Sequence, residues 1–228
     1  MSFIPAIHIQ LESFTAFFRH PLTISGTQVT MPTPSYSTLL GLISACAGKV
    51  ISPKDTQIGF EFWSRSNDNE NERTERLVYE KGKLKSHREG SGILNRKIHF
   101  KTRLELYLTN LDLKDAFENP VNAPCIGRSQ DLAWITLVKD VKLYPQKSGN
   151  LGPALIPGFV ENVPGMLLRC VDWYENTTFG FTRLAGKVGR YHSMLSTSET
   201  RFDVTAKNLY HPDDAKDNDV IYLHDWTN

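Results

Sequence analysis

The stretch from Lys97 to Thr109 constrains the fold most, because apolar and polar residues alternate along it. Neighbouring side chains of a β-strand point to opposite faces of the sheet, so this pattern predicts one long strand with two different faces. One face would pack on a core, and the other would be cationic with an aromatic ring at its end. The predicted inner residues are Ile98, Phe100, Leu104, Leu106 and Leu108, and the predicted outer residues are Lys97, His99, Lys101, Arg103, Glu105 and Tyr107.

The patterns around this strand predict an α+β domain. A helix is expected after Met31, with Thr33 as its cap, Pro34 as its first residue and Gly48 as its end. Gly41 within it suggests the close approach of another backbone or of a ligand, a helix–sheet contact being the more frequent reason. The order of elements is strand, helix, strand, strand, helix, strand, which is the ferredoxin-like (RRM-like) βαββαβ order of many RNA-recognition modules. The expected ranges are 5–13, 34–47, 58–65, 97–109, 112–117 and 133–138.

A polar insertion and a C-terminal extension complete the predicted organisation. Residues 66–96 are expected to form a projecting β-hairpin thumb, since Lys81-Gly82 lies between two strand-like runs and Gly90-Ser91-Gly92 follows. Residues 1–139 would then be the ferredoxin-like domain. Beyond residue 140, proline and glycine are frequent and short β-type runs occur at 166–173, 178–184 and 220–226. Residues 140–228 are therefore predicted to be a β-rich extension packed on the first domain.

Positive charge is concentrated in one part of the chain. The sequence has 26 Lys and Arg against 25 Asp and Glu, for a net charge of +1. Between Arg73 and Arg103, however, ten Lys or Arg stand against three Glu. A local excess of this kind suits phosphate binding, because neutralised phosphates release their counterions. A solvated surface hairpin without a ligand explains the same excess, so the charge alone leaves both interpretations open.

Several classes of protein are disfavoured. Cys46, Cys125 and Cys170 are odd in number and far apart, so they are expected to be buried free thiols in a reducing compartment. The histidines show no metal-type spacing, and we expect no metal or cofactor. No apolar run approaches the roughly 20 residues of a membrane span, and the N-terminus lacks the features of a signal peptide. We therefore expect a cytoplasmic protein with no membrane partner.

Four segments together resemble one family. They are Phe17-Phe18-Arg19-His20-Pro21, then Met31-Pro32-Thr33-Pro34-Ser35 leading into Leu39-Leu40-Gly41-Leu42-Ile43, then the charged insertion, and finally Cys125-Ile126-Gly127-Arg128-Ser129. In this order the segments resemble the RAMP subunit that caps the crRNA 5′ handle in type I CRISPR effector (Cascade) complexes, the "Cas five" family, with a loose likeness to the I-B group. The resemblance covers residues 1–139 well and the remainder only as an extension that such proteins often have.

This resemblance implies a non-catalytic RNA-binding subunit. Its implied partners are the crRNA 5′ handle, the adjacent backbone RAMP subunit reached by the thumb, and the large subunit. The resemblance leaves undecided whether the chain also contacts target DNA within the full complex. Arg19 and the helix start at Tyr36 and Ser37 would lie near the handle, where free N–H groups suit a phosphate. Gly127 would let the backbone approach RNA while Arg128 supplies charge, and Ser129 is the third RNA-binding residue implied in this turn. On the thumb, phosphate contacts are implied for Arg73, Arg76, Lys81, Lys83, Lys85 and Arg88, and base stacking for Tyr79.

Two alternatives compete with this interpretation. Some members of the family cut the repeat RNA, and Tyr36, His99 and Lys101 supply the residue types of a metal-independent endoribonuclease. In the other alternative the chain is a scaffold whose thumb contacts only acidic protein surfaces.

We also expect the outer residues Lys97, His99, Lys101 and Arg103 to form an RNA platform, unless the C-terminal extension folds over them. Trp63, Trp134 and Trp173 are expected in the core.

Overall fold

The computed structural model describes residues 2–23, 27–176, 182–197 and 200–226. Its centre is a group of four strands, β1 (Ile4–Ala16), β3 (Ile58–Glu80), β4 (Lys83–Leu108) and β5 (Ala133–Leu151). β1 pairs with both β4 and β5, and β3 pairs with β4, so the four lie side by side in the order β5-β1-β4-β3. All three pairings are antiparallel. The alternation at residues 5–13 and 97–109 therefore correctly predicted the two central strands.

Helix α1 (Tyr36–Ala47) starts two residues later than predicted. Its N-cap is Ser35, whose Oγ accepts a hydrogen bond from the Thr38 N–H, whereas the Thr33 hydroxyl bonds to the Ser193 hydroxyl at 2.8 Å. Gly48 ends the helix with φ 65°, as predicted. The expected approach of another backbone to Gly41 was wrong, because a Cβ there would meet no atom of the described chain within 4 Å.

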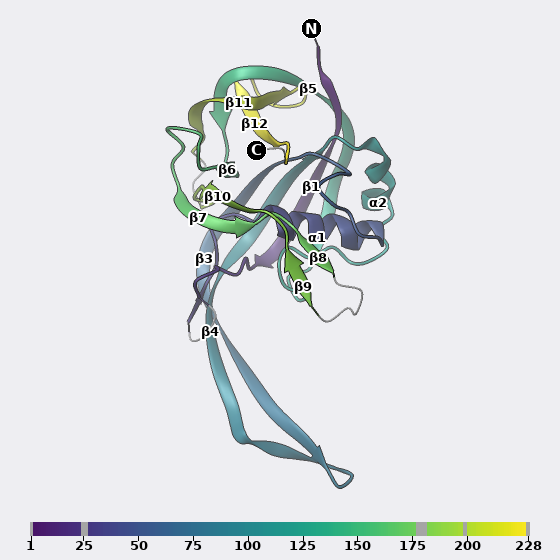
Figure 1. Cartoon of the computed structure of the whole chain (residues 1–228), viewed down its shortest axis with the longest axis vertical. Helices are drawn as coiled ribbons and strands as arrows, with labels where there is room; N and C mark the ends of the chain where they lie inside the picture. Colours follow the sequence, from purple (N-terminus) through teal and green to yellow (C-terminus); the bar gives the residue numbers. More distant parts are fainter. Residues whose placement is uncertain (1, 24–26, 177–181, 198–199, 227–228) are drawn as a thin grey trace.

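The helices cover one face of the four strands (Figure 1). A 3-10 turn (Leu111–Leu113) leads into the short helix α2 (Lys114–Glu118), which contacts α1 and β5. Leucine, isoleucine and phenylalanine side chains from α1, α2 and the strands form the main core. Burial of this apolar surface is the main force that holds the helices on the sheet. Fully buried members include Ile9, Leu11, Ile43, Phe62 and Leu104.

The C-terminal part of the chain is built from short strands, and it closes the main sheet. β11 (Phe202–Pro212) pairs with the second half of β5, and β12 (Asp219–His224) joins β11 to the start of β3. Together with the β5-β1-β4-β3 pairings, this gives a closed ring of six strands. β5 runs without interruption past residue 139, so the two predicted regions share a strand.

The remaining strands form two small sheets. One contains β6 (Leu155–Pro157), β10 (Val188–Ser193) and β7 (Met166–Val171), and it adds Leu155, Leu168 and Tyr191 to the main core. The other is the hairpin of β8 (Tyr174–Asn176) and β9 (Arg183–Ala185). Of the β-type run predicted at 178–184, residues 178–181 lie outside the described residues.

The β3–β4 hairpin leaves the body as a long two-stranded arm (Figure 1). Pairing continues from Ile58–Leu108 out to Glu80–Lys83, with one irregularity near Glu75. Lys81 (φ 50°) and Gly82 (φ 77°) form the tip, so the turn was predicted correctly. Gly90-Ser91-Gly92 does not form a second turn: β4 continues through it, with Gly90 at φ 60° beside the irregularity. We call residues 66–96 the thumb. At its base, β2 (Gln28–Val29) pairs with Arg96 and Lys97.

The predicted alternation of β4 holds only in part. Leu104, Leu106 and Leu108 are buried as expected, but His99 is fully buried and Phe100 is 38% exposed. The cause is Lys101, whose φ of 49° is left-handed. A left-handed residue turns the backbone, and here it reverses which side chains face the core.

Two further predictions from the sequence concern the state of the cysteines and membrane-spanning segments. Cys46 and Cys170 are buried free thiols, whereas Cys125 is partly exposed. No helix in the described part of the chain has the length and apolar character needed to cross a bilayer.

Candidate nucleic-acid interface

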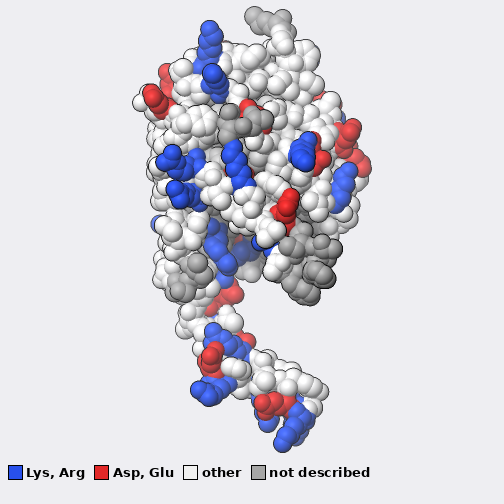
Figure 2. Space-filling model, viewed as in Figure 1, with Lys and Arg blue, Asp and Glu red and all other residues white. Residues whose placement is uncertain are grey.

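The thumb presents an exposed, mixed-charge surface. Its Lys and Arg side chains alternate with carboxylates along the arm (Figure 2). Arg73 contacts Glu75 at 3.0 Å, while Arg76–Glu89 and Lys85–Glu80 are both at 3.6 Å. These pairs are exposed and contribute little to stability, so a polyanion could displace them. Three further predicted phosphate contacts make no ion pair with any described residue; they are Lys81, Lys83 and Arg88.

The two faces of the thumb tip differ in chemistry. Register places Tyr79 opposite Leu84 and Leu77 opposite Ser86, which brings three apolar side chains to one face. Leu77, Tyr79 and Leu84 are 55%, 71% and 64% exposed. The other face carries Lys83 and Lys85. Tyr79 is thus accessible for stacking, as the predicted role requires.

Charged residues at the base of the thumb are engaged with one another. Arg96 forms an ion pair with Glu72, donates to Gln28 Oε1 at 3.0 Å, and lies 5.7 Å from the centre of the Phe17 ring. Only 11% of the Arg96 side chain is exposed. Arg19 in the adjoining β-bridge is exposed, and so is Lys97. Of the predicted cations at this base, Arg19 and Lys97 are therefore the accessible ones.

The Gly127-Arg128-Ser129 turn is built into the body. Gly127 has φ 112°, and a Cβ there would lie 2.2 Å from the Phe17 carbonyl oxygen. The glycine is thus required by a close approach of the chain to itself. Arg128 donates from Nε and Nη2 to the Asp131 carboxylate, both at 2.8 Å, and also pairs with Glu70. These bonds raise its pKa above the ordinary value. Arg128 therefore stays charged, and its charge is balanced by Asp131 and Glu70. Of the three residues, only Ser129 offers an exposed side chain.

Tyr36 does not lie where RNA could reach it. Its side chain is 1% exposed and its hydroxyl donates to the Leu155 carbonyl at 2.8 Å. The ring stacks on His224 at 4.1 Å. Burial raises the pKa of Tyr36 well above its usual range, so the hydroxyl keeps its proton. Of the predicted pair at the helix start, only Ser37 is partly accessible.

His99 is likewise a core residue. Its Nε2 lies 2.8 Å from the Met31 carbonyl, which can only accept, so Nε2 carries the proton and Nδ1 accepts from the Ser64 hydroxyl at 3.2 Å. Burial lowers its pKa to about 4, and the ring is neutral at pH 7. The prediction that His99 lies on the outer face was wrong. Tyr36 and His99 are each enclosed in the core while Lys101 is exposed, so the three do not form a surface site.

The face of the sheet opposite the helices, called the outer face, is covered over one half by the C-terminal strands. Tyr107 and Ala6 are buried against Val141 and Ile221, in a cluster formed where the C-terminal strands fold over. His8 lies there between Asp214 (2.6 Å) and Glu105 (2.7 Å). Burial opposes charging of His8 and is the largest single effect, but the hydrogen bonds to the two carboxylates and their negative charges together outweigh it and raise the pKa of His8.

A second charged pair under this cover joins the buried Glu61 to the partly exposed Arg201 through two bonds of 2.6 and 2.7 Å. Sequence analysis missed it, because the two residues are far apart in the chain. Glu61 alternates with the core residues Phe60 and Phe62 on β3, so the pattern alone placed it on the outer side of the strand and gave no sign of its burial. Lys101 and Arg103 lie beyond the cover and are exposed.

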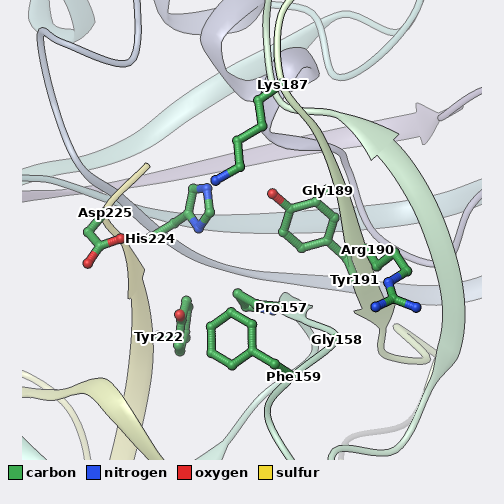
Figure 3. A pocket seen from close by; sticks show the side chains of 10 residues that line it. All are labelled: Pro157, Gly158, Phe159, Lys187, Gly189, Arg190, Tyr191, Tyr222, His224 and Asp225. Atoms are coloured by element: carbon green, nitrogen blue, oxygen red, sulfur yellow. The ribbon is translucent and has the colours of Figure 1, made fainter. Parts of the chain in front are cut away.

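A pocket of about 240 Å³ lies in the extension, between β6, β10 and β12 (Figure 3). His224 is 3% exposed, and its Nε2 has no hydrogen-bond partner among the described residues. Burial lowers its pKa to about 4. Four of the ten lining residues are aromatic, and the lining also carries two basic residues, Lys187 and Arg190, and the acidic Asp225. None of the residues predicted from sequence lines this pocket: Pro157, Gly158, Phe159, Lys187, Gly189, Arg190, Tyr191, Tyr222, His224 and Asp225. Within the described residues, no three His, Cys, Asp or Glu side chains are grouped to hold a metal ion.

Comparison with known proteins gives a structural match without a sequence match. No protein-family model matches the chain, and no curated protein does. Among solved structures, a chain described as "CRISPR RNA-guided surveillance complex" aligns with a TM-score of 0.54 at 12% identity, covering 90% of this chain and 92% of that one. A "CRISPR protein from Archaeoglobus fulgidus" aligns at 10% identity with a TM-score of 0.48, covering 97% and 100%. The first match carries the conclusion: this chain has the fold of a CRISPR-associated protein from an RNA-guided surveillance complex.

Proposed function

We propose that this chain is a non-catalytic crRNA-binding subunit of a type I, Cascade-type CRISPR effector complex. In this role it holds the 5′ handle and contacts the adjacent backbone subunit through the thumb. The observation that carries the proposal is the long thumb, with its exposed Lys and Arg side chains, on a fold shared with a chain of a CRISPR surveillance complex. The strand order β5-β1-β4-β3 with two helices on one face supports a ferredoxin-like body.

The absence of catalysis is part of the proposal. A general base or acid must come within hydrogen-bond reach of the ribose it acts on. Tyr36 and His99 are 1% and 0% exposed, and both make internal hydrogen bonds. Their burial supports a structural role for each, and it favours RNA binding over RNA cleavage.

The proposal is tested by the RNA that the protein carries in its own cells. Affinity purification of the tagged chain, followed by sequencing of the co-purified RNA, should yield short RNAs with a common repeat-derived 5′ end. Co-purified proteins should include a backbone subunit and a large subunit. Recovery of no such RNA, although the chain is folded and expressed, would contradict the proposal.

A further inference from the structure

The outer face of the sheet has an open half where aromatic rings gather. Phe14 on β1 and Trp134 on β5 lie with their ring centres 5.2 Å apart, and they are 63% and 41% exposed. Phe100 on β4 is 38% exposed. We call these three side chains the aromatic patch. The expectation that Trp134 is a core residue is therefore wrong.

Strand register places the patch on adjacent strands. β1 lies between β4 and β5, with Thr15 opposite Phe100 and Glu12 opposite Trp134. Ser13 and its partner Thr102 are 2% and 3% exposed, on the helix side with Leu104. Since side chains alternate, Phe14 and Trp134 project from the opposite face. The C-terminal strands cover that face near Ala6, Tyr107 and Val141 but leave the patch open.

The backbone itself turns Phe100 outward. Left-handed φ at a residue other than glycine costs about 1 kcal/mol or more, and Lys101 adopts it at 49°. The result is that a histidine is buried and a phenylalanine is exposed, which is the reverse of what burial energy favours. Strain that exposes an apolar ring is expected where the ring has a ligand to meet.

Cations surround the patch. Lys101 lies 5.8 Å from the centre of the Phe100 ring, and Arg103 contacts Glu105 at 3.0 Å with half of its side chain exposed. Arg65, between Ser64 and Ser66 on β3, is exposed as well. Glu12 lies opposite Arg103 and offsets one of these charges. Rings interleaved with cations match a strand of nucleotides, in which bases stack and phosphates pair with Lys and Arg.

We propose that the aromatic patch binds single-stranded RNA by base stacking, with Arg65, Lys101 and Arg103 holding its phosphates. The ligand is single-stranded because stacking needs base faces that a duplex hides. This inference rests on the proposed function and adds a second RNA contact on the body, separate from the thumb. It assigns stacking to Phe14, Phe100 and Trp134, and phosphate contact to the three cations.

The test compares ring-removing with ring-retaining variants of the full chain. The probe is a labelled short oligoadenosine RNA, and its affinity is measured by fluorescence anisotropy. Phe14→Leu with Trp134→Leu should weaken binding about tenfold or more, since one stacked base is worth about 1–3 kcal/mol. Phe14→Tyr with Trp134→Phe keeps both rings and should stay close to wild type. Phe3→Leu, an exposed ring at the other end of the sheet, is the matched control. The melting temperature of each variant reports folding.

Each outcome of the affinity measurement either supports or overturns the assignment of base stacking to the aromatic patch. Equal affinity of the leucine and aromatic variants, or no binding of the probe by the folded wild type, would overturn the inference. If the leucine variant bound RNA normally but failed to enter the complex in cells, the patch would be a protein-binding surface and the inference would fail. Co-purification of handle-bearing RNA with the wild type tests the proposed function separately. That result could stand even if the patch proved irrelevant to RNA.

Discussion

Arg128 and Asp131 form a bidentate pair three residues apart, in which the carboxylate is fully buried and the guanidinium side chain is 14% exposed. The pair closes the turn that also contains Gly127, whose backbone touches Phe17 at the root of the thumb. A sequence segment that resembled an RNA-binding turn is therefore a brace between the body and the thumb.

The brace predicts a large loss of stability when it is broken. Asp131→Asn leaves a poorly exposed arginine without its main partner, and it should cost about 3 kcal/mol in the free energy of unfolding. Gly127→Ala should cost at least as much, because φ is 112° and the new Cβ would meet the Phe17 carbonyl. Urea denaturation measures both. Gly41→Ala is the control: its Cβ enters open space on α1, and it should be neutral or stabilising by up to about 1 kcal/mol. Similar stability of Gly127→Ala and wild type would rule out the brace.

The thumb should bind RNA through phosphates. Changing Lys81, Lys83, Lys85 and Arg88 to Glu should weaken RNA binding or complex assembly and flatten the salt dependence of affinity, because fewer counterions are released. Affinity measured over a series of salt concentrations gives the slope. The matched control reverses four exposed lysines away from the thumb, Lys49, Lys54, Lys147 and Lys207, and should change the slope less. An unaltered salt dependence of affinity in the thumb variant would show that the thumb does not bind RNA phosphates.

Incubation of the purified protein with its own repeat RNA should give no discrete cleavage product. Tyr36 and His99 are enclosed in the core, and neither can reach a ribose without unfolding. A single-site cut that is abolished by Tyr36→Phe, a change that leaves the ring stack on His224 in place, would establish the endoribonuclease alternative.

His99 should make the folded state sensitive to acid. Its folded pKa is lowered to about 4 from an unfolded value near 6.5, so the unfolded chain binds a proton first as the pH falls. The stabilisation is complete above pH 6.5 and is lost between pH 6.5 and 4. Chemical denaturation across this window should show a shallower fall in stability for His99→Gln than for wild type. His87→Gln, at an exposed position on the thumb, serves as the control. Identical slopes for wild type and His99→Gln would contradict this assignment.

The outcome of sequence analysis depended on how local each signal was. The central strands, the Lys81-Gly82 tip and the Gly48 helix end follow from neighbouring residues, and they were predicted correctly. The inside-outside assignment failed at His99 and Phe100, because a single left-handed residue, Lys101, reverses it and no rule of alternation marks a lysine for that conformation. Similarly, nothing near Arg128 signals Glu70, its partner across the thumb base.

The ring of strands also sets an order of events during synthesis. The thumb pairs residues close in sequence, so β3 and β4 can zip together from the Lys81-Gly82 tip as soon as both have left the ribosome. The ring, in contrast, closes only when β12 reaches the Ile58 end of β3. Until then, one edge of β3 is unpaired and can pair with other nascent chains. Aggregation is therefore most favoured in the interval before residues 219–224 are made and cover this edge.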